Sequence, residues 1–410
     1  MPVAQSVWRN SAFRRLVGAD VLSQFGTQVT LVALPLTALL VLDATPFQLG
    51  LLTAAEMAAF LVIGLPAGVW ADRMRRRPIL VAADGVRALA LFSVPVAAFA
   101  DVLTLAQLYA VALVIGVGTV FFDVAHMSLL PSIVRKDGLS TGIGTLETLR
   151  NAAWLAGPGF GGWLVQVLAA PFALLADAIS YACSALVLST IKADETSAAP
   201  AERRSVKAEV AEGLRYVLGH QVLRRVALVG ALNMLTNGLW AIVQPLFLVR
   251  ELDLGAGAYG LIVSAAGAGG VLGGALAPKI VARYGNGGAM YGGAVLAGLF
   301  PLIGGFAGEG WRVLLYPLGL FLMLVAAVVF NVAQSSYRQA VTPDHLRGRM
   351  NASMRFLMWS AMPVGGLLGG LLAERVSVGV LLWVACLGTA TAHLPVIVSP
   401  WIRRLRAEAG

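Results

Sequence analysis

The chain has 410 residues, of which 58% are hydrophobic and only 12% charged, and its formal net charge is +9. Soluble globular proteins carry about 25% charged residues, so this composition excludes a soluble protein with an ordinary polar surface. The positive residues stand at the ends of apolar runs rather than along one polar face, which argues against a nucleic-acid partner. A partner that fits is the lipid bilayer.

Twelve apolar runs are long enough to span a membrane, which takes about 20 residues in a helix. The predicted spans are 15–42, 47–70, 78–100, 104–126, 143–168, 172–191, 223–249, 258–282, 287–308, 311–335, 350–373 and 378–400. The long polar interruption after the sixth run divides them equally. We therefore expect an N-terminal six-helix bundle at 1–191, a cytoplasmic basic linker at 192–222, and a C-terminal six-helix bundle with a short basic cytoplasmic tail at 223–410.

The linker carries apolar residues at four-residue steps, at Val206, Val210, Leu214 and Leu218, with charges between them. This spacing predicts an amphipathic helix on the inner leaflet of the membrane. Most of the 30 Lys and Arg residues fall in the loops that share a side with the N-terminus. Cytoplasmic loops are enriched in positive residues, so we expect a multi-pass cell-membrane protein with both termini in the cytoplasm.

Cofactor and metal signals are lacking in the sequence. Cys183 and Cys386 lie inside apolar runs without metal-ligand spacing, His126 and His345 stand alone at helix ends, and no phosphate-binding Gly-x4-Gly-Lys-Ser/Thr loop occurs. We expect no cofactor, no metal and no ATP hydrolysis.

The two halves repeat. Gly68-Val-Trp-Ala-Asp72-Arg73 ends the second run, and Gly274-Ala-Leu-Ala-Pro278-Lys279 ends the eighth. Phe122-Asp123-Val-Ala125 and Phe330-Asn331-Val-Ala333 close the fourth and tenth runs. Parallel six-helix repeats are the plan of one large class of transporters, in which the substrate site lies near the membrane midplane.

With these motifs the chain resembles the major facilitator superfamily, over essentially its whole length. The family's loop motif is matched by Gly68, Asp72, Arg73 and Arg76, while Arg75 stands where the family usually has glycine. The resemblance implies that the four matching residues form a conformational latch, in which Asp72 packs near the start of the eleventh helix and Arg76 bridges helices.

A second motif resembles that of the family's drug antiporters, which carry a glycine–proline pattern in the fifth helix. It is matched, except for Ala153 in place of a glycine, by Gly144, Gly157, Pro158, Gly161 and Gly162. Glycines at this spacing let helices approach closely. Ordinary small-residue packing is the alternative interpretation.

A third set of residues resembles the branch that contains macrolide efflux proteins and the enterobactin exporter. It comprises Asp84-Gly-Val-Arg87, Phe121-Phe122-Asp123, Asp177-Ala-Ile-Ser180 and Gly213-Leu-Arg215-Tyr216. Many proton-coupled exporters of the family have an arginine inside the fourth helix. This chain has none there, so the proton relay tied to that arginine is not carried over.

Ionisable residues inside the spans are functional candidates, because a charge at the membrane centre costs at least roughly 2.5–3.5 kcal/mol. Glu56 lies about nine residues into the second run, near mid-membrane, where it could carry a proton or bind substrate; a structural hydrogen bond is the alternative. Asp84 and Arg87 share a helix face and predict a structural or gating pair, with direct substrate contact as the alternative.

The other polar candidates divide into two groups. Asp20 and Asp123 are also candidates for proton coupling or substrate binding, but they are expected to pair with nearby arginines at the cytoplasmic gate rather than to act as midplane ligands. Asp177, placed near an outer helix end, is expected to be structural. Neutral hydrogen bonds to a substrate, or between helices, could come from Asn233, Asn237, Gln244, Asn331 and Gln334.

We therefore predict an all-α integral membrane protein, and not an enzyme. It is expected to act as a monomeric secondary transporter that exports small amphipathic molecules in exchange for protons by alternating access. A metabolite importer or facilitator of the same fold remains open. A membrane-embedded enzyme would need catalytic clusters at one membrane face, and a non-transporting receptor would bind its ligand without flux.

Overall fold

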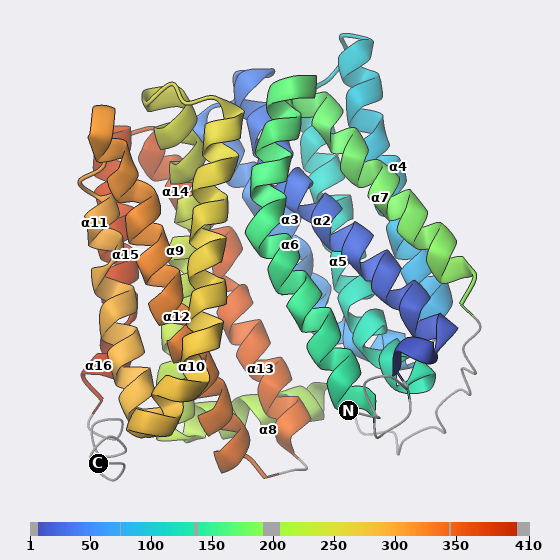
Figure 1. Cartoon of the computed structure of the whole chain (residues 1–410), viewed down its shortest axis with the longest axis vertical. Coiled ribbons are helices and arrows are strands. Elements are labelled where there is room, and N and C mark those ends of the chain that lie inside the picture. The colour runs from blue at the N-terminus through green and yellow to red at the C-terminus, as the bar shows by residue number, and fades with distance from the viewer. Residues whose placement is uncertain (1–6, 74, 135–137, 192–205, 344–345, 400–410) are drawn as a thin grey trace. The chain divides into compact units, whose positions relative to one another are not determined.

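The computed structural model describes residues 7–73, 75–134, 138–191, 206–343 and 346–399. Within these ranges every regular element is a helix, as Figure 1 shows. Packing divides the chain into two compact units, and each is described by itself. The first unit contains Met1–Ala44 and Ala55–Arg203, and the second contains Thr45–Ala54 and Arg204–Gly410. The domain boundaries expected from the sequence stay a prediction.

The first unit is a bundle in which α7 packs against both α2 and α4, α6 packs against α2, and α4 packs against α5. Its apolar core is formed around fully buried Phe13, Leu16, Leu80 and Leu129. The elements are α2 (Ser11–Leu40), the later part of α3 (Pro46–Arg73), α4 (Arg76–Phe99), α5 (Leu105–Ile133), α6 (Leu139–Leu168) and α7 (Ala170–Ser189).

In the second unit the closest helix pairs are α10 with α12 and α9 with α14. Its core includes fully buried Val217, Leu223, Met290 and Met350. The elements after α3 are α8 (Val206–Gly219), α9 (Gln221–Pro245), the π-helical turn η2 (Leu246–Glu251), α10 (Ala256–Leu299), α11 (Pro301–Gly304), the 3-10 turn η3 (Gly310–Leu314), α12 (Leu315–Val341), α13 (Arg347–Trp359), α14 (Ala361–Ala373), α15 (Val378–Ala392) and α16 (Leu394–Ile397).

The long α10 is two helices joined at Gly285. Its φ of 67° and ψ of 171° are not helical, and a positive φ is accessible to glycine without the strain that a side chain would add. Ten segments of the described ranges are long and apolar enough to cross a membrane, and one of them contains both halves of α10. Dividing α10 at Gly285 and adding the 30-residue α6 gives the twelve long helices that the sequence predicts.

The predicted amphipathic helix of the linker forms as α8, but its buried face differs from the expected one. Figure 1 shows α8 running crosswise to the long helices of the second unit. Leu218 is exposed and Val217 is buried, because α8 packs on α13. Arg349 of α13 donates to Glu212 at 2.6 Å, and the Tyr216 hydroxyl donates to the Val341 carbonyl at 3.0 Å. The side chains of Val206 and Val210 lie outside the described residues.

Two helix-ending turns repeat between the halves. Asp43 follows α2 with a φ of 46°, and Asp253 follows η2 with a φ of 51°. The amide after each aspartate bonds back across the last helical turn, from Ala44 to Ala38 at 2.9 Å and from Leu254 to Leu248 at 3.0 Å. Aspartate tolerates this left-handed conformation better than most residues. The backbone thus preserves a repeat at positions that the motif comparison did not identify.

Close packing of α9 on α14 yields a prediction about stability. A Cβ atom on Gly365 would collide with the Leu235 carbonyl, whereas a Cβ atom on Gly274 would meet nothing within 4 Å. Overpacking costs typically about 1–3 kcal/mol. We expect Gly365→Ala to lower the melting temperature of the purified protein in detergent and Gly274→Ala to leave it unchanged. Equal melting temperatures for the two variants would contradict this description of the α9–α14 contact.

Candidate functional site

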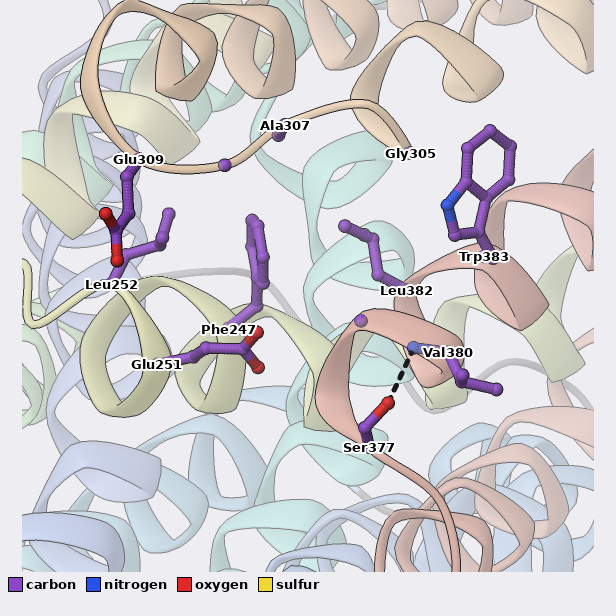
Figure 2. Close-up of a pocket in the computed structure, with 12 residues that line it drawn as sticks. Phe247, Glu251, Leu252, Gly305, Ala307, Glu309, Ser377, Val380, Leu382 and Trp383 are labelled. Carbon is purple, nitrogen blue, oxygen red and sulfur yellow. Dashed lines mark hydrogen bonds between the residues drawn. The ribbon is translucent and has the colours of Figure 1, made fainter.

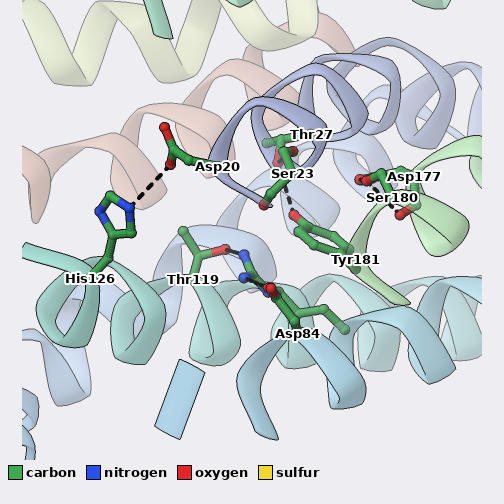
Figure 3. Close-up of polar contacts among 10 residues, drawn as sticks. Asp20, Ser23, Thr27, Asp84, Thr119, His126, Asp177, Ser180 and Tyr181 are labelled. Atoms are coloured by element: carbon green, nitrogen blue, oxygen red, sulfur yellow. Dashed lines mark hydrogen bonds and ion pairs between the residues drawn. The ribbon is translucent and has the colours of Figure 1, made fainter. Parts of the chain in front are cut away.

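The first unit holds a network of polar side chains from four helices, most of which Figure 3 draws. Asp84, Arg87 and Asp177 have at most 2% of their surface exposed, which is unusual for charged groups unless they are paired. The network comprises Asp20, Ser23, Thr27 and Thr30 of α2, Asp84 and Arg87 of α4, Thr119 and His126 of α5, and Asp177, Ser180 and Tyr181 of α7.

Arg87 lies at the centre of this network. One guanidinium nitrogen donates to Asp84, and another lies 3.4 Å from the Thr119 hydroxyl. The guanidinium carbon lies 4.7 Å from the ring centre of Phe122 and 4.1 Å from that of Tyr181. Because the pair is buried and cation–π contacts are worth about 0.5–2 kcal/mol each, three helices hold the one positive charge in place. The predicted Asp84–Arg87 pair therefore forms.

Within the described part of the chain, the hydrogen bonds that the Asp177 carboxyl accepts come from neutral hydroxyls. Thr30 of α2 donates to one carboxyl oxygen, and Ser180 donates to the other at 2.9 Å. Gly26 makes room for this contact, because a Cβ atom there would collide with both Asp177 and Ser180. Asp177 is the eighth residue of α7, which begins at Ala170, and the contact of α7 with α2 buries its carboxyl fully. Its expected structural role stays a prediction.

Asp20 pairs with a histidine rather than with an arginine. Its Oδ1 atom lies 3.5 Å from Nε2 of His126, and both side chains are buried. The sequence suggested a lone histidine at a helix end, but α5 continues to Ile133 and places His126 inside the bundle. Asp123, one turn earlier, is half-buried and interacts with other groups. The pair between α2 and α5 had no signal in the local sequence pattern.

Glu56 makes no hydrogen bond to this network among the described residues. It is half-buried on α3, and within the described ranges no group donates a hydrogen bond to its carboxyl. The α3 and α5 backbones approach closely at this point, because a Cβ atom on Gly116 would collide with the Glu56 carbonyl oxygen. The structural hydrogen bond considered for Glu56 therefore does not form with the described residues.

Some of the glycines in the glycine–proline motif of α6 (Leu139–Leu168) lie in the contact between α6 and α2. Gly157 packs against the side chain of Gln28, and Gly161 packs against the backbone of Val29, so these glycines bring α6 close to α2. Pro158 and Gly162 are also buried. Gly144 differs, because a Cβ atom there would meet nothing within 4 Å; it lies in a shallow groove with Trp8 and Thr145.

The latch residues cannot be compared in full with the expectation. The side chains of Gly68, Asp72 and Arg73 lie outside the described residues. Arg76 is half-buried at the start of α4 and interacts with other groups. The latch stays a prediction.

The neutral polar candidates of the second unit do not gather into one cluster. Asn233 donates to Val229 at 2.9 Å and lies 3.4 Å from His393, whereas Gln334 donates to Asn331 at 2.6 Å. Asn237 is exposed and Gln244 is half-buried. Sequence reasoning missed the aromatic group beside them, in which the rings of Trp240 and Phe247 flank Tyr316 with centroids 6.0 and 5.7 Å away.

A cavity of about 460 Å³ lies within the second unit, between η2, the segment before η3 and the start of α15. Figure 2 shows Phe247 and Trp383 on its wall and the carboxylates of Glu251 and Glu309 beside it. Both glutamates are exposed, so water can solvate them without a bound partner. The sequence singled out none of these residues.

The Asp84–Arg87 pair yields a prediction about stability. Removing one partner of a buried pair leaves an uncompensated charge and costs about 3–5 kcal/mol. We expect Arg87→Gln to lower the melting temperature in detergent sharply. The double variant Asp84→Asn with Arg87→Gln removes both charges and should recover much of the loss. The pairing would be contradicted if the melting temperature of the double variant fell by the sum of the decreases measured for Arg87→Gln and Asp84→Asn alone.

Three comparisons bear on identity. The model of the Major Facilitator Superfamily matches residues 16–366. The multidrug efflux pump Tap of Mycolicibacterium fortuitum is 28% identical over 368 residues, which cover 85% of this chain and 86% of that protein. Macrolide efflux protein A of Streptococcus pyogenes is 24% identical over 373 residues, covering 87% and 88%.

Among solved structures, that of the nucleoside transporter NupG superposes with a TM-score of 0.74 and 13% identity, covering 96% of this chain and 99% of that one. This likeness concerns the fold alone, and it confirms the predicted all-α membrane architecture. With the family match over most of its length, the chain belongs to the Major Facilitator Superfamily and is a membrane transporter of that family.

Proposed function

We propose that this transporter exports small amphipathic organic molecules in exchange for protons. The export direction is supported by the relatives, since proteins named for multidrug and macrolide efflux align with most of this chain. The proton is supported by the first unit, in whose described residues three carboxyls are buried, those of Asp20, Asp84 and Asp177, against one arginine, Arg87. That excess is the observation on which the coupling proposal depends.

The carboxyls differ in how firmly their charge is compensated. Asp84 has Arg87 as a direct partner, whereas Asp177 has two hydroxyls and Asp20 has one histidine. A buried carboxyl without a fixed positive partner can bind a proton and become neutral at little structural cost. Asp20 and Asp177 are therefore better proton carriers than Asp84, whose role is to hold Arg87.

Glu56 is the other proposed carrier. Its half-buried carboxyl has no hydrogen-bond partner in the described part of the chain, so it is available to a proton or to a cationic group of a substrate. A proton and a cationic substrate would compete for the Glu56 carboxyl. This competition would couple substrate release to proton uptake.

The second unit supports the substrate side of the proposal. The polar residues that are buried in the described part of this unit carry hydroxyls, an amide or the imidazole of His393. Trp240 donates to Thr389 at 3.0 Å beside Tyr316 and Phe247. Phe247 also lines the cavity of this unit, together with Trp383, and pockets with aromatic walls and few polar groups bind many apolar shapes. The amides of Asn233, Gln244 and Asn331 would add hydrogen bonds to such a substrate.

We further propose that the protein works as a monomer in the cell membrane with both termini in the cytoplasm. The clustering of Lys and Arg in loops on one side supports this orientation. The two halves would alternate access, with Asp72 and Arg76 stabilising one state, and no catalytic chemistry is part of the proposal. An importer or facilitator of the same fold is the second candidate, since the fold alone does not set direction.

Expression in a bacterial strain that lacks its main drug exporters tests the proposal. We expect higher inhibitory concentrations of erythromycin or tetracycline, or lower ethidium accumulation, and loss of the effect when a protonophore collapses the proton gradient. Accumulation that rises on expression would favour the importer. Export that survives the protonophore and follows another ion gradient would overturn proton coupling.

The role of Glu56 has a matched control on α6, where Glu147 is exposed. We expect Glu56→Gln to lower proton-driven export strongly, because glutamine keeps the size of the side chain but cannot exchange a proton. Glu147→Gln makes the same chemical change at the surface and should leave export unchanged. Wild-type export by the Glu56 variant, at equal expression, would exclude Glu56 as a carrier.

A further inference from the structure

Asp20 and His126 form a buried pair in the first unit whose facing polar atoms make no hydrogen bond to the described residues. Their side chains are 1% and 3% exposed, and their nearest polar atoms are 3.5 Å apart, longer than an ordinary hydrogen bond. The two carboxyl oxygens of Asp20 and Nε2 of His126 have no hydrogen-bond partner among the described residues. The two side chains are therefore close enough to share a charge, but no hydrogen bond from the described residues holds these three atoms.

Burial restricts the protonation states that this pair can hold. An ionised carboxylate without a counter-charge is very costly in an apolar interior, so the group must be neutralised or paired. A protonated imidazole beside Asp20, or a protonated Asp20 beside a neutral imidazole, meets this condition. In both arrangements the closed pair retains one proton, and only hydration of Asp20 would let that proton leave.

The pair is connected to the central arginine by an aromatic ring. His126 stacks on Phe122 with ring centres 5.5 Å apart and an interplanar angle of 15°, and the Arg87 guanidinium lies 4.7 Å from the centre of the same Phe122 ring. A shift of Arg87 would therefore move the ring that covers His126. The charged groups that face His126 are Asp20 on α2, Asp84 on α4, Asp123 on α5 and Arg150 on α6.

The position along the helices suggests which side receives the proton. Asp20 is the tenth residue of α2 and His126 lies seven residues before the end of α5. At 1.5 Å per residue both lie roughly 10–15 Å from those helix ends, which are cytoplasmic in the proposed orientation. A proton leaving the pair would thus have the shorter route to the cytoplasm.

We propose that Asp20 and His126 form the proton-release site of the transport cycle, with Nε2 of His126 as the atom that gains and loses the proton. This inference rests on the proposed proton-coupled export. An N–H bond forms when the proton arrives from the outer side, and the same bond breaks when hydration of Asp20 lets the proton pass to cytoplasmic water. Asp20 stabilises the protonated imidazole, and Phe122 relays the state of Arg87.

The test uses purified full-length protein in liposomes, with tritiated erythromycin as probe and ethidium where erythromycin is not moved. Two measurements are made: uptake driven by an acidic liposome interior, and exchange of labelled for unlabelled probe at equal pH. We expect His126→Gln and Asp20→Asn to lower gradient-driven uptake by roughly tenfold or more, since proton-transfer groups contribute about that much or more. Exchange should stay near the wild-type rate.

The control is His220, which precedes α9 outside the apolar spans and accepts a hydrogen bond from the Leu223 amide at 3.3 Å. His220→Asn removes a histidine but keeps a side chain suited to this capping position, and it should leave both measurements unchanged. Melting temperatures in detergent identify variants that fail to fold, in which case the His126→Asn variant replaces His126→Gln.

The possible results distinguish a failure of the proposed proton-coupled export from a failure of the proposed Asp20–His126 release site. If the unaltered protein moves neither probe, or moves one without protons, the proposed function and the inference are both wrong. If the unaltered protein couples transport to protons and His126→Gln does so equally well, only the inference is wrong. Equal loss of uptake and exchange in a folded variant also overturns it, because a merely structural role predicts that result.

Discussion

The packing of the first unit depends on stabilising the buried positive charge of Arg87. Arg87 cannot lose its charge, so α4 must supply Asp84, and α5 and α7 must supply aromatic faces on both sides of the guanidinium. These requirements fix the rotation of three helices about their own axes. Tyr181 then extends the arrangement to α2 through a hydroxyl contact of 2.9 Å with Thr27.

The helices could be predicted from the sequence because lipid imposes a local rule: an apolar run of sufficient length must become a helix. The break at Gly285 lies in the gap between two predicted spans, and the Asp84–Arg87 pair follows from spacing on one helix. The partners of Asp20 and Asp177 could not be predicted in the same way. His126 and Thr30 each lie on another helix, and which helix faces meet depends on packing that no local pattern encodes.

The two units differ in chemistry although they repeat in fold. Charged groups are buried in the first, whereas the described buried polar groups of the second are amides, hydroxyls and His393. The motif repeat already contains this difference, because Asp123 corresponds to Asn331 and Asp72 to Pro278. Duplication followed by loss of charge in one half would leave one bundle suited to ions and the other to uncharged surfaces, without a change in backbone.

The placement of Asp84 and Arg87 on the same helix also matters while the protein is being made. Helices enter the membrane from the translocon in chain order, and an unpaired Asp or Arg at the centre costs about 2.5–3.5 kcal/mol on entry. With its counter-ion one turn away, α4 brings a neutral pair into the membrane before α5 and α7 have been synthesised. A partner on a later helix would leave the arginine unpaired during insertion, so the i, i+3 spacing protects the assembly of the bundle as well as its final state.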